Sequence, residues 1–210
     1  MLFNTAAQLT KRLYYLLWLG PRGYGKPVPK DILLSQYKRG DWDYLRSIDE
    51  LARYMVIVGY IHSMYKRKSP IVLDVGCGYG LLLELLSPFS FESYLGIDLS
   101  SEAIKRAEPL VTGNAKFEVA DFEKWEAPRS FDIIVFNESL MYAKRPVDVL
   151  LRYSRSLNGN GLMIVSIFRT GLRRAIWRSL DKYFAVIHSI MVKNPKGQIW
   201  DIRVVQPKAA

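Results

Sequence analysis

The chain has 210 residues, of which half are hydrophobic and 24% are charged, so a largely disordered protein is excluded. This length suits one domain with a full core. The single cysteine, Cys77, excludes an intrachain disulfide and predicts a reducing, cytoplasmic location. The two histidines, His62 and His188, are far apart in sequence, so we expect no metal site.

The net charge of +10 is distributed unevenly along the chain. Residues 1–70 carry +7, residues 71–165 carry −4 and residues 166–210 carry +7. Two explanations account for the basic ends equally well: a solubilising surface, and a cleft that attracts an anionic ligand.

The first third of the sequence predicts a helical cap and a linker. The stretch "AAQLTKRLYYLLWL" favours a short helix, and its apolar run at 13–20 is too short to cross a bilayer and lacks a signal-peptide cleavage site. Three glycines and three prolines at 20–30 indicate an irregular linker. From residue 44, apolar residues at helical spacing predict an amphipathic helix that "KRKSP" at 66–70 ends. We therefore expect a cap, lid and linker over residues 1–66.

From residue 71 the pattern alternates between strands and helices, which predicts an α/β domain over residues 67–210. The expected architecture is a doubly wound, mostly parallel sheet with helices on both faces. Two further strand-like runs around "NPKG" predict a terminal β-hairpin. The expected strands are 71–75, 93–99, 115–121, 131–137 and 161–168, and the expected helices are 80–86, 100–108, 146–157 and 171–184.

The segment "VLDVGCGYG" at 72–80 is a glycine-rich turn after a strand, but it is not built for phosphate. Position 81 is Leu where the dinucleotide fingerprint needs Gly, and no Gly-Lys-Ser/Thr follows as in a P-loop. Asp74 would also repel a pyrophosphate. A cofactor with adenosine and positive charge but no phosphate fits better, and S-adenosylmethionine has that composition.

Two more acids follow the next strands. Asp98 lies 22 residues after Gly76, close to the spacing at which a carboxylate reaches ribose hydroxyls. Asp121, followed by Phe122, ends the third strand, where a carboxylate and a ring suit adenine. Each acid also has a purely structural interpretation, because Asp74 and Asp98 could cap backbone N–H groups and Asp121 could form an Asx turn.

Residues 71–168 resemble the Rossmann-like, class I S-adenosylmethionine-dependent methyltransferases of the small-molecule type, with a domain like methyltransferase types 11 and 12. "VLDVGCGYG", "YLGIDLS", "VADFEKW" and "FDIIVFNESLMY" are similar to their first four motifs. "LNGNG" at 157–161 departs from their L-x-P-G-G turn. The resemblance implies seven strands with an antiparallel last strand, and S-adenosylhomocysteine as the product.

The resemblance also implies the cofactor site. Basic and aromatic residues ahead of the first motif form a lid in related enzymes, and an arginine there can bind the cofactor carboxylate. The expected cofactor-binding residues are Asp74, Gly76, Cys77, Gly78, Gly80, Asp98, Leu99, Asp121, Phe122, Asn137, Arg53, Tyr37 and Trp42.

Catalysis is expected near the end of the fourth strand. Methyl transfer is an in-line displacement, so positioning supplies much of the rate and a base is needed only if the acceptor must lose a proton. Glu138 is the first candidate for acceptor contact or proton removal, with Tyr142 beside it. His188 is a second candidate base, although a lone histidine in an apolar strand is more often packed and hydrogen-bonded.

The expected acceptor is a small, anionic molecule, such as a sugar, glycan-linked or secondary metabolite, methylated on oxygen or nitrogen. "NESL" at 137–140 replaces the Asn/Asp-Pro-Pro-Tyr/Phe signature of DNA amino-methyltransferases. The alternatives are an RNA methyltransferase and a non-catalytic S-adenosylmethionine-binding protein. Residues 1–25 could also contact an anionic membrane, and the sequence predicts no particular oligomeric state.

Overall fold

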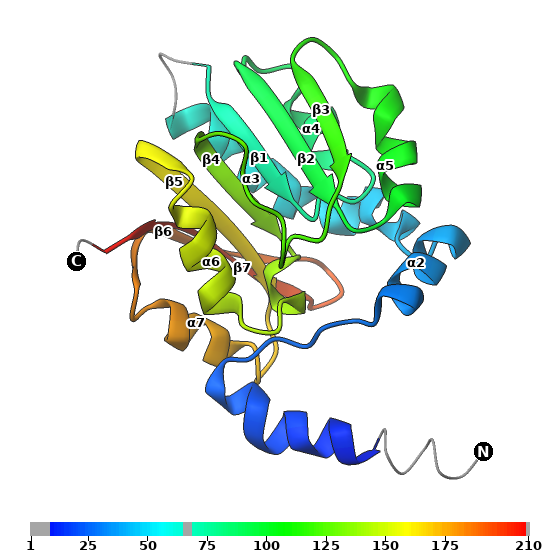
Figure 1. Cartoon of the computed structure of the whole chain (residues 1–210), viewed down its shortest axis with the longest axis vertical. Coiled ribbons are helices and arrows are strands. Elements are labelled where there is room, and N and C mark those ends of the chain that lie inside the picture. Colours follow the sequence, from blue (N-terminus) through cyan, green and yellow to red (C-terminus); the bar gives the residue numbers. More distant parts are fainter. Residues whose placement is uncertain (1–8, 65–68, 209–210) are drawn as a thin grey trace.

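A seven-stranded sheet forms the centre of the molecule (Figure 1). The computed structural model describes residues 9–64 and 69–208. The strand order is β3-β2-β1-β4-β5-β7-β6; β1 to β5 are parallel, and β7 runs antiparallel to β5 and β6. This confirms the predicted fold class and the terminal hairpin. The strands are β1 (Ile71–Val75), β2 (Ser93–Asp98), β3 (Ala115–Val119), β4 (Phe131–Asn137), β5 (Leu157–Phe168), β6 (Phe184–Lys193) and β7 (Ile199–Pro207).

Helices cover both faces of the sheet because its central strands are apolar on both sides. Leu73 and Ile134 belong to one hydrophobic cluster together with α6 and α7, whereas Val72 and Ile133 belong to a second cluster with α3 and α4. Alternate residues of a strand point to opposite faces, so β1 and β4 supply both clusters. The helices are α2 (Lys30–Arg39), α3 (Ile48–Met64), α4 (Leu81–Leu86), α5 (Ser101–Ala107), α6 (Pro146–Ser154) and α7 (Arg174–Leu180).

The capping prediction for α5 is confirmed. Ser100 precedes the helix with extended backbone angles, and its Oγ accepts a hydrogen bond from the backbone N–H of Ala103 at 3.2 Å. Strand β2 therefore passes directly into α5, which fixes Asp98 at the carboxyl edge of the sheet.

The elements differ from the sequence-based expectations in several places. Strand β3 ends at Val119, and helices α6 and α7 end at Ser154 and Leu180, each short of its expected end. The amphipathic helix begins at Ile48, because residues 43–46 form a 3₁₀ turn and Ser47 is extended. Its end was expected within 66–70, of which residues 66–68 lie outside the described residues. Helix α2 was not predicted, because Tyr37 is the residue it buries and its other positions are mostly polar. Strand β5 begins at Leu157 and so includes the expected "LNGNG" turn, at an irregular register with β4.

The N-terminal part of the described chain is helical, as expected. Residues 9–14 are α-helical and continue into a π-helical turn, Tyr15–Leu19, and a 3₁₀ turn, Gly20–Arg22. Within the described residues no helix has the length and hydropathy needed to span a bilayer.

Candidate functional site

A cavity of about 630 Å³ lies at the carboxyl ends of β1, β2 and β4. Ligands of open α/β sheets bind at this edge. The predicted site residues that line this cavity are Arg53, Tyr37, Trp42, Gly76, Cys77, Gly78, Asp98, Leu99, Asp121, Phe122, Asn137, Glu138 and Tyr142. Asp74, Gly80 and His188 do not line it.

The glycines of the first loop allow a turn that other residues would strain. Gly76, Gly78 and Gly80 have φ angles of +77°, +54° and +76°. A Cβ on Gly76 would lie 2.5 Å from the Cβ of Ser139, and one on Gly80 would lie 2.8 Å from Phe117 Cζ. The loop therefore packs closely against its neighbours and presents backbone at Gly76 and Gly78 to the cavity.

Asp74 is buried and lies away from the cavity. Its Oδ2 accepts a hydrogen bond from the Tyr94 hydroxyl at 2.6 Å, while Oδ1 has no partner among the described residues. Burial raises the pKa of the Asp74 carboxyl to about 7, although the Tyr94 hydrogen bond opposes the shift. In this structure Asp74 is thus held by a side chain of β2.

Asp98 holds the glycine loop and the start of α5 together. Its Oδ2 accepts from Gly78 N at 2.9 Å and from the Tyr37 hydroxyl at 3.3 Å, and its Oδ1 accepts from Ser100 N at 2.9 Å. Burial raises the pKa of Asp98, and these hydrogen bonds counteract the rise. Asp98 therefore lies at the cavity and fixes the turn before α5, whereas the helix itself is capped by Ser100.

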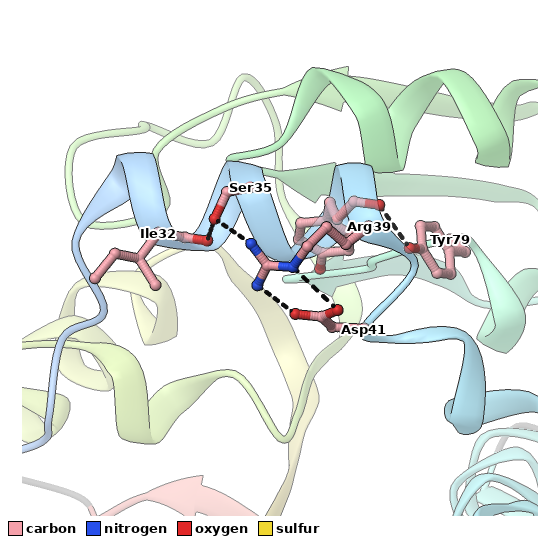
Figure 2. A network of polar contacts seen from close by, with 6 residues as sticks. Ile32, Ser35, Arg39, Asp41 and Tyr79 are labelled. Carbon is pink, nitrogen blue, oxygen red and sulfur yellow. Dashed lines mark hydrogen bonds and ion pairs between the residues drawn. The ribbon is translucent and has the colours of Figure 1, made fainter.

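Helix α2 covers part of the cavity and is anchored at its C-terminal end. Arg39 donates to Ser35 Oγ at 3.2 Å and to Asp41 Oδ2 at 2.6 Å, which ties the last turn of α2 to the residues that follow it (Figure 2). The Tyr79 hydroxyl, from the glycine loop, donates to the carbonyl oxygen of Tyr37 at 3.3 Å. Helix α2 is therefore attached directly to the glycine loop.

Two aromatic side chains of the lid region lie together at the cavity. The rings of Tyr37 and Trp42 have centroids 5.8 Å apart, and both line the cavity. The Trp42 Nε1–H is buried and has no partner among the described residues. Such an orphaned donor leaves a place for a polar ligand atom.

Arg53, from α3, is almost fully buried at the cavity wall. It forms an ion pair with Glu50 at 2.7 Å and donates to Asn137 Oδ1, which brings α3 to the end of β4. Its guanidinium lies 4.5 Å from the centroid of the Tyr54 ring. Its Nε has no partner in the described chain, so one donor remains available.

Asp121 and Phe122 follow β3, whereas Arg53 lies at the end of β4, on the other side of β1 in the sheet. Asp121 pairs with Lys124 at 3.6 Å, and its Oδ1 accepts from Glu123 N, which is the Asx-turn geometry. Phe122 packs edge-on against Phe136 of β4, with centroids 6.4 Å apart. Because Asp121 is partly exposed and lines the cavity, the turn leaves it accessible to a ligand.

Glu138 has a strained backbone at the end of β4, with a φ of +59°. Its Oε1 accepts from Ser166 Oγ at 2.7 Å and its Oε2 from Phe168 N at 3.0 Å. Burial raises the pKa of Glu138, while Arg53 and, more weakly, Arg173 act in the opposite direction. Non-glycine residues in this region of φ are frequent at functional sites.

His188 lies apart from the cavity. It is exposed on β6, next to a register irregularity, and its ring centroid is 5.8 Å from that of Tyr60. This position gives it no route to a molecule in the cavity, which disfavours the proposed base role. The apolar pattern around His188 correctly predicted a strand, but it did not indicate that this strand lies at the edge of the sheet beside β7.

Several cavity residues were not predicted from the sequence. Glu50, Ser139 and Trp200 come from α3, the β4 loop and β7, and Lys30 and Arg173 come from the starts of α2 and α7. Ser139 directly follows the predicted Glu138, so it could have been found. Lys30 and Arg173 carry no local signal, since only the tertiary fold brings helix starts to the cavity. No cluster of metal-ligating side chains occurs in the described ranges.

Residues 66–203 match the family model described as "Methyltransferase domain", which is well over half of the chain. The chain therefore belongs to this family of methyltransferase domains.

Two curated relatives and one solved structure are informative. A malonyl-[acyl-carrier protein] O-methyltransferase of Paenibacillus sp. (strain JDR-2) is 30% identical over 156 residues, which cover 67% of this chain and 55% of that protein. The mitochondrial ubiquinone biosynthesis O-methyltransferase of Saccharomyces cerevisiae is 31% identical over 143 residues. The matched residues cover 63% of this chain and 43% of that protein. The chain thus spans about half the length of these relatives. N-methyltransferase NodS from Bradyrhizobium japonicum WM9, solved with S-adenosyl-L-homocysteine, has a TM-score of 0.70 at 17% identity, covers 83% of this chain and 98% of its own, and shares the fold.

Proposed function

We propose that the protein is an S-adenosylmethionine-dependent methyltransferase of a small, anionic acceptor. The observation that carries the proposal is the convergence of the glycine loop, Asp98, Asp121 and Arg53 on one cavity beside Glu138. The family assignment supports the reaction class, and the solved relative with bound S-adenosyl-L-homocysteine supports the cofactor. S-adenosylmethionine, when bound, supplies a methyl group on a positively charged sulfur.

The residues present fit this cofactor. Arg53 Nε and Trp42 Nε1 are buried donors without partners in the described chain, and both side chains line the cavity. Arg53 suits the cofactor carboxylate, and Asp121 with Phe122 suits the adenine ring. We assign the ribose hydroxyls to Asp98, which then exchanges the 3.3 Å contact from the Tyr37 hydroxyl for a ligand hydroxyl.

An anionic acceptor is favoured by the cations of the cavity. Five cationic side chains and five carboxylates line it, so the attraction for an anion depends on the cations that lack an ion pair. Three cations are paired: Arg46 with Glu84, Arg53 with Glu50 and Lys124 with Asp121. These pairs leave two cations to consider.

Lys30 and Arg173 are those two cations, and neither occurs in the ion pairs of the described part of the chain. Arg173 donates to the carbonyl oxygen of Phe168 at 3.3 Å and lies close enough to lower the pKa of Glu138. We infer that an acidic group of the acceptor binds between Lys30 and Arg173, near Glu138. The names of both curated relatives specify O-methylation, which favours an oxygen atom as the acceptor.

Glu138 is placed to orient the acceptor and, where the acceptor is protonated, to take its proton. Each carboxylate oxygen already accepts one hydrogen bond and keeps a further lone pair. Because the pKa of Glu138 is raised, its carboxylate is a stronger base than an exposed one. A carboxylate acceptor needs no base, and Glu138 then only positions it.

Calorimetry with S-adenosylhomocysteine tests the cofactor site. We expect the wild-type chain to bind it and Asp98→Asn to bind it about 10- to 100-fold more weakly, since hydrogen bonds to a charged group contribute about 1.5–3 kcal/mol. Asp148→Asn, on α6 and away from the cavity, is the matched control. No binding by the wild type, or tighter binding of a nicotinamide nucleotide, contradicts the proposal.

Assays of the wild type and of variants of the cavity cations, with acidic small molecules and with RNA as acceptors, then separate the substrate classes. Arg173→Ala should raise the KM of an acidic acceptor at least tenfold and leave S-adenosylhomocysteine affinity unchanged. The alternative of an RNA methyltransferase is supported if the protein methylates RNA and if substitution of Lys30, Arg173 or distant basic residues lowers that activity equally. Cofactor binding without turnover of any acceptor supports the non-catalytic alternative.

We further propose that residues 1–66 form the cap, that residues 67–210 form the core, and that the protein is located in the cytoplasm.

A further inference from the structure

The helical segment at the start of the described chain presents apolar side chains to solvent. Leu9, Leu13, Leu16 and Leu17 follow one another at spacings of four, three and one residue, so they form one stripe along the helix. Contiguous exposed apolar surface of this kind marks an interaction site. The exposed apolar side chains of the segment are Leu9, Leu13, Tyr14, Leu16, Leu17 and Trp18.

The segment has a defined orientation relative to the rest of the molecule. Tyr15 and Leu19 are half-buried, and the Tyr15 hydroxyl donates to the carbonyl oxygen of Tyr24 at 3.3 Å. Gly20, which follows, packs against Leu172. Leu17 is 74% exposed, so the leucine stripe faces away from the protein. Figure 1 shows this segment at the lower edge, beside α7.

Cations surround the stripe. Lys11 and Arg12 are exposed on the helix itself, and residues 9–30 contain no acid. The Arg22 guanidinium lies 3.6 Å from the Trp18 ring centroid. Arg174 and Arg178, exposed one turn apart on α7, add positive charge beside the 3₁₀ turn that α7 contacts.

We propose that the leucine stripe and these cations form a membrane-docking surface for anionic lipid bilayers. Leucine and tryptophan side chains enter the acyl boundary while lysine and arginine pair with head-group phosphates, as in other interfacial helices. A second copy of the chain fits this surface less well, because two such surfaces would bring their cations together. The chemistry of an anionic bilayer complements both the apolar stripe and the charge.

The docking surface is linked to the cavity through a short connection. The N–H of Lys26 donates to the carbonyl oxygen of Met141 at 2.8 Å, and Pro27, Val28 and Lys30 line the cavity. The segment that follows the docking surface thus forms part of the cavity wall, and, resting on the proposed function, we infer that the anionic acceptor is lipid-linked.

Vesicle co-sedimentation of the full chain tests the proposal. We expect binding to phosphatidylcholine vesicles that contain phosphatidylserine, much weaker binding to pure phosphatidylcholine, and a loss of binding as salt is raised. The double variant Leu13→Glu, Leu17→Glu should lower the partition coefficient at least tenfold. Lys11→Gln, Arg12→Gln should lower it severalfold on anionic vesicles only.

The matched control is Ile48→Glu, Val111→Glu, which exchanges two exposed apolar residues elsewhere for the same charges. This variant should bind vesicles like the wild type. Circular dichroism and S-adenosylhomocysteine affinity report whether each variant is folded, and vesicle binding is read without activity. No vesicle binding by the wild type, or a dimer in solution that Leu13→Glu, Leu17→Glu dissociates, overturns the proposal.

Discussion

Glu138 alone among the described non-glycine residues has a positive φ. A left-handed backbone costs a side-chain-bearing residue about 1–2 kcal/mol. The Glu138→Ala variant keeps this cost and also loses the hydrogen bonds to Ser166 and Phe168. We expect Glu138→Gly to lose the same bonds but to remain about 1 kcal/mol more stable than Glu138→Ala in urea denaturation. Equal stability of the two variants would show that the side chain, not the backbone, sets the cost.

Asp74 makes the stability of the protein depend on pH. Its pKa is about 7 in the folded state against an ordinary value of 3.8, so the folded state prefers the protonated form. The stabilisation is therefore complete below pH 3.8 and is lost as pH rises through 7. Asp74→Asn lacks this dependence, so the wild type should lose about 4 kcal/mol relative to the variant between pH 4 and pH 8. The raised pKa of Asp74 would be contradicted if the free energy of unfolding in urea changed with pH equally in the two proteins across that range.

At the scale of elements, the loop between β1 and α4 depends on close packing of Gly76. Gly76→Ala meets both a positive φ and a Cβ contact of 2.5 Å with Ser139. Gly113 has a φ of +57° but open space around it, so Gly113→Ala reports the φ cost alone. We expect Gly113→Ala to lose about 1 kcal/mol in urea denaturation and Gly76→Ala to lose about 1–3 kcal/mol more. A similar loss in both variants would mean that Ser139 moves freely.

The elements with strong local patterns were predictable. The apolar runs of β1, β2 and β4 and the cap at Ser100 specify strands and a helix start, and these place Asp98 and Glu138 at the sheet edge. Helix α2 lacks such a pattern, although Pro29 before it and Gly40 after it are boundary signals. Arg173 could not be predicted as a cavity residue, since its position depends on the packing of α7 against distant segments.

At the scale of the whole molecule, the proposed cap and core share one hydrophobic interior. Ile57 and Ile61 of α3 belong to the same cluster as Val72 of β1 and Ile202 of β7. We therefore expect one cooperative transition in urea, with coincident midpoints from far-UV circular dichroism and tryptophan fluorescence. Separate midpoints would show that the segment before residue 67 unfolds by itself.

The connection from Gly25 to Lys30 is held over the site through its main chain. A Cβ at Gly25 would lie 2.0 Å from the carbonyl oxygen of Ala143, and the N–H of Lys26 fixes the same stretch to Met141. The side chains of Pro27, Val28 and Lys30 contribute to the cavity without providing that attachment. Substitutions at these three positions can thus change the shape and charge of the cavity without loosening the connection, while glycine at position 25 must be retained.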